Sequence, residues 1–287
     1  MENGKLQINI KSETANILIE KISDAIGWVV RPYQIRRIAR AEADADITRA
    51  LTKIEIDELT RRALGRVVIE ETKKQDNMES IISKALPQLE DNANPKEIDD
   101  DWITNFFDKC RLISGEEMQA LWAKVLSGEA NSPGKYSKRT VNFLASLDTS
   151  EASLFANLCG FGWFIGEVVP LIYDSKSSIY LEHDITFNSL THLDEIGLLS
   201  FGHLVGYKRL NFPKRIQIFY YGIPIIIEFS KDNENDLDIG TVILSKVGQE
   251  LAPICGAKPV PGFFDYVINR WINQELTLSS PYPLITK

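Results

Sequence analysis

The spacing of apolar residues changes near residue 160, and this change constrains the fold more than any other feature of the sequence. Before it, apolar residues recur every three or four positions, which is the spacing of one helix face. After it, short stretches such as residues 215–221 alternate apolar and polar side chains, as half-buried strands do. A chain of 287 residues also exceeds the usual size of one compact domain. We therefore predict a mainly α protein with a C-terminal α+β module.

Composition and helix signals divide the chain into five segments. Residues 12–90 are predicted to form a helical arm or hairpin, and residues 91–101, acidic and without apolar periodicity, a linker. Residues 102–160 follow as a central helical bundle and residues 161–275 as the α+β module. The tail, residues 276–287, contains proline and serine and is predicted to be loose.

The predicted arm carries a narrow apolar stripe over residues 35–72. Its members follow helical spacing: Ile38, Ala43, Ile47, Leu51, Ile54, Leu59, Ala63 and Val67. Isolated amphipathic helices are marginal in water, so this stripe must pack against residues 15–30, against the bundle, or against another chain. The flanking faces carry nearly balanced charge, which favours self-association or a protein partner through residues 35–72, as in a coiled coil.

The central segment contains the signals of several short helices. Asp100 or Asp101 can cap the first, and Ser114 with Glu117 has the spacing of a capping box for the next. One core is predicted to unite the apolar side chains of these helices, namely Trp102, Phe106, Leu121, Trp122 and Leu144.

The α+β module is predicted to contain strands, helices and a hairpin. Residues 178–181 and 236–244 have strand-like composition, and residues 187–196 have the pattern of a helix. Two alternating stretches flank Gly222, which predicts a β-hairpin. Helix, helix and then a hairpin is the order of a winged-helix module, so a winged-helix-like arrangement of this part is one interpretation.

Net charge argues against a protein that binds nucleic acid over its whole surface, because the chain carries a formal charge of -8. Two local clusters remain candidates. The one near the predicted hairpin contains candidate nucleic-acid contacts, namely Lys208, Arg209, Lys214 and Arg215. The second basic patch contains Arg31, Arg36, Arg37 and Arg40. The helix that would enter a groove, however, carries Asp194 and Glu195 and no arginine or lysine, which favours an exposed charged rim.

No group of residues points to catalysis, a metal or a cofactor. The three cysteines lack the paired spacing of a zinc site, and the three histidines match no ligand signature. Residues 160–166 imitate a dinucleotide-binding loop only weakly. We therefore predict no catalytic residues, no metal and no cofactor.

The first residues contain no apolar run of the secretory type. The longest apolar stretches, residues 160–165 and 223–227, fall far short of the roughly 20 residues of a membrane span. The sequence therefore predicts a cytoplasmic protein without a membrane span.

Residues 101–140 resemble a known family. The residues that carry the likeness are Asp101-Trp102-Ile103, Phe106-Phe107-Asp108-Lys109-Cys110, Glu116 to Leu126, Gly128-Glu129, Ser132-Pro133-Gly134 and Ser137-Lys138-Arg139-Thr140. This pattern is similar to the bacterial uncharacterised family catalogued as domain of unknown function 2806 (DUF2806), and residues 26–43 share the likeness. The resemblance implies no activity or catalytic residue.

A weaker likeness joins residues 116–151 to helical domains of some abortive-infection proteins of phage defence. The function expected from the sequence is therefore a non-enzymatic binding or assembly protein, with phage defence or stress response as its setting. The alternative is a nucleic-acid-binding regulator that uses the winged-helix-like module.

Overall fold

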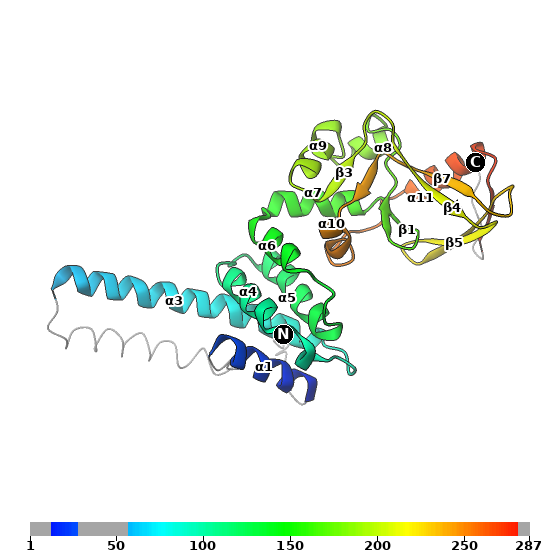
Figure 1. Cartoon of the computed structure of the whole chain (residues 1–287). Coiled ribbons are helices and arrows are strands. Elements are labelled where there is room, and N and C mark those ends of the chain that lie inside the picture. Colours follow the sequence, from blue (N-terminus) through cyan, green and yellow to red (C-terminus); the bar gives the residue numbers. More distant parts are fainter. Residues whose placement is uncertain (1–12, 28–56, 281–287) are drawn as a thin grey trace, which may run out of the picture. The chain divides into compact units, whose positions relative to one another are not determined.

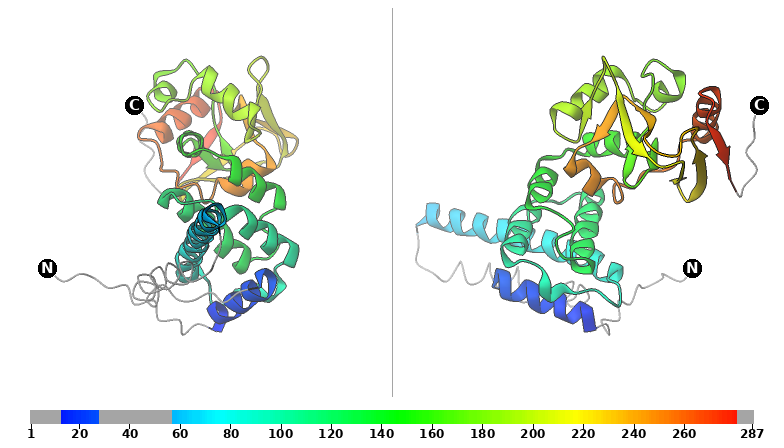
Figure 2. Two further views of the ribbon diagram at one scale, coloured as in Figure 1. Left: turned by 90° about the vertical axis from the view of Figure 1, so that its left-hand side faces the viewer. Right: turned by 45° about the vertical axis from the view of Figure 1, so that its right-hand side comes forward.

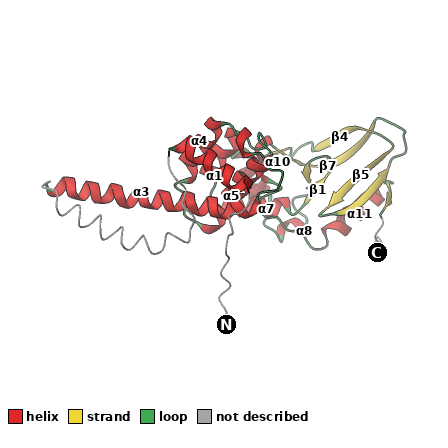
Figure 3. Ribbon diagram, turned by 90° about the horizontal axis from the view of Figure 1, so that it is seen from below, coloured by secondary structure: helices red, strands yellow, loops and turns green. Residues whose placement is uncertain are grey.

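The computed structural model describes residues 13–27 and 57–280 of the chain, which divides into two compact units, Met1–Ser146 and Leu147–Lys287. Figure 1 and Figure 3 show that the described part of the first unit is helical and that the described strands belong to the second. The described fold is thus mainly α with a C-terminal α+β part, as predicted. In the described residues, helices of the segments predicted as arm, linker and bundle pack on one another within the first unit.

The first unit consists of helices and two short 3₁₀ turns. Its elements are α1 (Glu13–Ile26), α3 (Glu58–Ala85), η1 (Leu86–Gln88), η2 (Pro95–Glu97), α4 (Asp100–Cys110), α5 (Glu116–Asn131) and α6 (Lys138–Ser146). The C-terminal part of α3 packs against α5, and α1 packs against α4 (Figure 2). These contacts bury one face of each helix, as the apolar spacing predicts.

The core of the first unit contains a cluster of aromatic rings among aliphatic side chains. Trp102, Phe106, Trp122 and Leu144 are all buried, which confirms their predicted common core, while Leu121 is only half-buried. The ring centre of Phe106 lies 5.1 Å from the ring centre of Trp102 and 5.0 Å from that of Trp122. Such ring pairs stabilise a core beyond the area that they bury.

The helix starts in this unit differ in detail from the predicted ones. Asp99, not Asp100 or Asp101, caps α4, because its carboxylate accepts a hydrogen bond of 2.8 Å from the Trp102 amide. The predicted capping box of Ser114 is wrong, since Gly115 is the N-cap of α5 and no side chain caps it.

Residues 91–101, predicted to be a linker, are integrated into the first unit. Pro95 and Ile98 are buried, and residues 95–97 form the turn η2. The amide of Asn94 donates a hydrogen bond of 2.9 Å to the Ala130 carbonyl at the end of α5. Two buried apolar side chains in a short acidic stretch are too few for a periodicity, so the sequence pattern did not reveal them.

The second unit alternates helices and short strands. Its helices are α7 (Thr149–Cys159), α8 (Ser178–Leu181), α9 (Phe187–Glu195), α10 (Lys246–Leu251) and α11 (Phe263–Asn273). Its strands are β1 (Gly162–Phe164), β2 (Val168–Pro170), β3 (Leu199–Phe201), β4 (Tyr207–Phe212), β5 (Arg215–Tyr220), β6 (Ile223–Glu228), β7 (Asn235–Gly240), β8 (Val242–Leu244) and β9 (Thr277–Ser279).

These strands form three antiparallel sheets. The largest has the order β2-β1-β5-β6-β9, and two-stranded sheets pair β3 with β8 and β4 with β7. The β5–β6 hairpin confirms the prediction at Gly222, whose φ of 85° places it in the left-handed region that glycine tolerates. The hairpin pairs with β1 and β9 and not with β3, whose partner is β8.

Three predicted segments of this unit differ in the structure. Residues 178–181 form the helix α8 instead of a strand, because four residues are too few to distinguish the two periods. The strand predicted over residues 236–244 is split into β7 and β8 after Gly240. The tail was predicted to be loose, but its residues 277–279 form β9, which pairs with β6.

Tyr220 connects three segments of the second unit. Its hydroxyl accepts a hydrogen bond of 2.8 Å from the Val260 amide and donates one of 2.9 Å to the Gly160 carbonyl. The ring stacks on the buried Trp163 at 5.1 Å. Burial raises the pKa of the Tyr220 phenol to about 12.

Candidate functional sites

The basic cluster of residues 208–215 lies on β4, β5 and the turn between them, and carboxylates neutralise most of its charge. Lys208 is exposed and forms no ion pair with a described residue. Its three neighbours form the ion pairs Arg209–Glu167, Lys214–Asp232 and Arg215–Glu228, the last two at 3.0 Å. A phosphate would therefore meet one uncompensated cation here, not four.

The other predicted elements of a nucleic-acid surface add little positive charge. Helix α9 carries Asp194, whose carboxylate accepts a hydrogen bond of 3.1 Å from the Phe201 amide and so fixes the helix to β3. The second basic patch, predicted from Arg31, Arg36, Arg37 and Arg40, lies outside the described residues.

Helix α3 begins within the stripe predicted over residues 35–72. Asp57 caps it, because its carboxylate accepts hydrogen bonds from the Thr60 hydroxyl at 2.7 Å and from the Thr60 amide at 3.0 Å. The same bonds hold the pKa of Asp57 below its usual value. The stripe thus contains a helix start at residue 58, and its members before residue 57 lie outside the described residues.

The N-terminal half of α3 exposes large apolar side chains to solvent. The exposed fractions are 70% for Leu59, 38% for Leu64, 48% for Val67 and 66% for Ile69. Leu64 and Val67 lie on the helix face that later carries Met78 and Ile81, which are buried, because the spacing is three or four residues throughout. One apolar face is therefore covered at the C-terminal end of α3 and open at its N-terminal end.

Two charged residues, Glu71 and Lys74, lie between the covered and the open parts of this face. They form an ion pair of 2.6 Å. The hydrogen bond from Lys74 holds the pKa of Glu71 below its usual value. The open part thus begins where the apolar packing inside the first unit ends.

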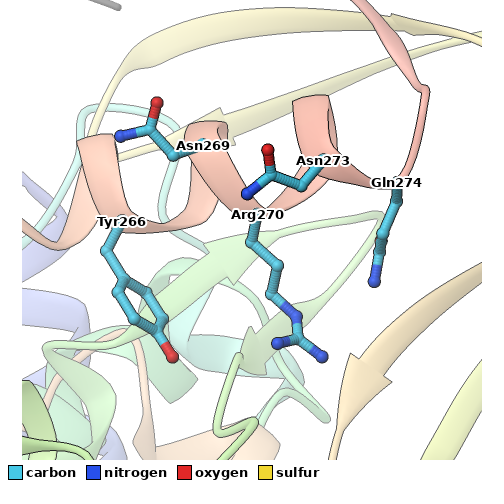
Figure 4. A pocket seen from close by; sticks show the side chains of 5 residues that line it. All are labelled: Tyr266, Asn269, Arg270, Asn273 and Gln274. Carbon is cyan, nitrogen blue, oxygen red and sulfur yellow. The ribbon is translucent and has the colours of Figure 1, made fainter. Parts of the chain in front are cut away.

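A pocket of about 420 Å³ follows one side of α11 in the second unit (Figure 4). Its lining consists of a phenol, a guanidinium and three carboxamides, from Tyr266, Asn269, Arg270, Asn273 and Gln274. Tyr266, Arg270 and Gln274 project to one side of the helix in this view, and Asn269 and Asn273 project to the other. No carboxylate is among these described lining residues.

Arg270 is held by two side chains from other elements. Its guanidinium stacks over the Tyr173 ring, 3.9 Å from the ring centre, and its Nη2 lies 3.3 Å from Oδ2 of Asp238. The second oxygen of Asp238 accepts a hydrogen bond of 2.9 Å from the Gly240 amide. Burial, followed by the charge of Asp238, raises the pKa of Tyr173, so its phenol stays neutral at physiological pH.

The pocket residues were not predicted from the sequence. Their spacing of three, one, three and one residues along a helix places them on one face, and this was a usable signal. The helix itself was predicted, but its polar face was indistinguishable from an ordinary solvated face. Only the fold brings Tyr173 and Asp238 to Arg270.

The cysteines and histidines serve local contacts. Cys110 and Cys159 are buried, and burial raises the pKa of both thiols, which keeps them unreactive. His192 lies 3.0 Å from Glu151. Within residues 13–27 and 57–280, no three side chains of the metal-binding types come together. No helix in these ranges is long and apolar enough to span a membrane.

The motif of residues 128–136 builds a loop. The buried carboxylate of Glu129 accepts hydrogen bonds of 2.6 Å from the Gly134 amide and 2.8 Å from the Tyr136 amide. The Tyr136 ring covers Gly128, where an added Cβ would lie 2.7 Å from a ring carbon. The Tyr136 carbonyl accepts a hydrogen bond of 2.7 Å from the indole of Trp102. These hydrogen bonds and the contact of the Tyr136 ring with Gly128 give the motif a structural role.

Comparison with known proteins places the chain by one match. A family model described as protein of unknown function (DUF2806) matches residues 61–268, which run from α3 into α11. No curated protein matches the chain, and no solved structure matches it.

Proposed function

The chain belongs to the DUF2806 family, and we propose that it is a non-enzymatic assembly protein that binds a second copy of itself through the N-terminal half of α3. The observation that carries this proposal is the open apolar face of that helix, with Leu64 and Val67 at its centre. Contiguous exposed apolar side chains mark interaction surfaces more often than scattered ones do.

Leu64 and Val67, Glu71 and Lys74, and Met78 and Ile81 follow one another at intervals of three and four residues. These are the intervals of the a and d positions of a coiled coil, with a charged pair between two apolar pairs.

The charged side chains around Leu64 and Val67 form ion pairs within α3. Arg61 and Arg62 lie 3.2 and 4.0 Å from Glu58, and Arg66 lies 3.8 Å from Glu70. The proposal therefore rests on the apolar side chains and specifies no orientation of the two helices.

The oligomeric state of the full chain tests this proposal. We expect sedimentation equilibrium to show a dimer that dissociates on dilution, and the double variant Leu64→Asp, Val67→Asp to be monomeric. Leu112→Asp is the matched control, because Leu112 is also an exposed leucine (68%) of the first unit but lies outside α3. A wild-type chain that stays monomeric at high micromolar concentration contradicts self-association. If the wild type is monomeric and the double aspartate variant melts at a lower temperature, the face is covered by the chain itself.

The order of elements in the second unit supports a second candidate, a nucleic-acid-binding regulator. The elements α8, α9, β3 and β8 follow the order of a winged helix, with β3 and β8 antiparallel and residues 202–241 as an enlarged wing. Fluorescence anisotropy with a short DNA duplex tests it. Binding that falls steeply with salt and is reduced in Lys208→Ala supports this function, and no binding at low salt contradicts it.

The expected setting in phage defence or stress response follows from the likeness of residues 116–151 alone. Cells that express the chain should restrict phage plaques, and the Leu64→Asp, Val67→Asp variant should not. Equal plaque numbers with and without the protein contradict this setting.

A further inference from the structure

The pocket along α11 has the size and chemistry of a small-molecule site. Sites for small ligands usually measure about 300–1,000 Å³ and place a few polar groups at fixed positions. The 420 Å³ pocket contains the guanidinium of Arg270, which is ion-paired with Asp238 through Nη2 only, together with the carboxamides of Asn269, Asn273 and Gln274 (Figure 4). Carboxamides both donate and accept hydrogen bonds, while the guanidinium only donates.

Arg270 is positioned before any ligand arrives. The Tyr173 ring supports one face of its guanidinium at 3.9 Å, and Asp238 holds Nη2 at 3.3 Å. Gly240, in the strand that carries Asp238, lies close to Ile172: its φ is 83°, and an added Cβ would lie 2.2 Å from the Ile172 carbonyl oxygen. The amide of Thr241 donates a hydrogen bond of 2.7 Å to the same oxygen and attaches the end of the strand. A side chain that is already ordered loses less entropy on binding.

The guanidinium keeps unused donors. It carries five N–H groups, and its hydrogen bond to a described residue is the one to Asp238. The side chain of Arg270 is 37% exposed, and its Nη1 donors form no hydrogen bond to a described residue. These exposed donors, unlike the buried Nε, can reach a ligand oxygen in the pocket.

From this geometry we propose that the α11 pocket binds a small polar molecule through an oxyanion, a carboxylate or a phosphate group. The oxyanion contacts Arg270, since planar guanidinium groups bind such oxygens with charge-assisted hydrogen bonds. Asn273 and Gln274, both exposed, contact the polar remainder of the molecule. This site lies wholly in the second unit and does not depend on self-association through α3.

Nuclear magnetic resonance of the full chain labelled with nitrogen-15 tests the site directly. Inorganic phosphate and acetate are titrated separately, and the side-chain amide signals of Asn273 and Gln274 and the Nε–Hε signal of Arg270 are followed. We expect a saturable shift of these signals. Saturation by phosphate but not acetate identifies a phosphate-bearing ligand, and the reverse result identifies a carboxylate-bearing one.

Three variants separate binding from stability. Arg270→Gln should weaken binding about tenfold or more, and Asn273→Ala, an exposed change that leaves the core intact, about three- to tenfold. Arg215→Gln is the matched control, because Arg215 is an ion-paired arginine of the same unit outside the pocket, and it should leave binding unchanged. A wild type without saturable shifts overturns the proposal, as does wild-type affinity in both pocket variants.

Discussion

Replacing Tyr220 with phenylalanine should destabilise the second unit by about 2–3 kcal/mol at neutral pH. The change removes only the hydroxyl and keeps the ring against Trp163. It leaves the Val260 amide without its 2.8 Å acceptor and the Gly160 carbonyl without its 2.9 Å donor. Buried backbone groups that lose their partners account for most of the cost, because water cannot replace the hydroxyl in this core.

The destabilisation caused by Tyr220→Phe should be smaller at high pH. The pKa of Tyr220 is about 12 in the folded chain, compared with about 10 in an unfolded one. The folded state therefore holds its proton more tightly, so the contribution of Tyr220 is complete below pH 10 and is lost as the pH rises towards 12. At pH 11 the wild type should have lost about 1 kcal/mol through this group.

Urea unfolding of both proteins at pH 7 and pH 11 measures the effect. The remaining tyrosines are common to both chains, so the difference between the two free energies of unfolding isolates Tyr220. We expect that difference to fall by about half between the two pH values. A difference that stays constant or grows would refute the assignment of a buried, hydrogen-bonded phenol at this position.

Three further substitutions probe the packing. Trp122→Ala should destabilise the first unit by about 3–5 kcal/mol in urea unfolding, because the indole is fully buried, and an unchanged melting temperature would refute its place in the core. Gly240→Ala should cost at least about 2 kcal/mol, since the new Cβ would meet the Ile172 carbonyl at a positive φ, and wild-type thermal stability would contradict that strain. Glu129→Ala should cost about 2–3 kcal/mol by removing the acceptor of two backbone amides, and rapid proteolysis at residues 132–136 would report the opened loop.

The sequence predicted best the elements that long or regular patterns define. Helices of the first unit and the β5–β6 hairpin repeat their pattern over several turns or residue pairs, so one misplaced residue does not hide them. Segments of three or four residues, such as α8 and β9, contain too little pattern to distinguish strand, helix and coil. Helix caps were predicted within one or two residues or missed, because several acidic residues in a row can each serve as the cap.

The candidate sites were less accessible to the sequence. The cluster at Lys208 was predicted from its charge, but three of its four cations have partners that lie elsewhere in the chain, at Glu167, Glu228 and Asp232. The pocket at Arg270 was missed for the same reason. In both cases, contacts between residues far apart in the chain decide what a charged side chain can do, and no local spacing encodes them.

Three strand pairs of the second unit are nested along the sequence. The strands β5 and β6 lie between β4 and β7, and β4 and β7 lie between β3 and β8. Once the innermost hairpin closes, only residues 213–214 and 229–234 still separate β4 from β7, so each later pairing closes a short loop instead of a long one. In this topology the strand pairs can form in order, beginning with the hairpin at Gly222 and ending with β3–β8. A substitution that strains this turn should therefore slow refolding of all three strand pairs, and the rate, more than the final stability, would reveal it.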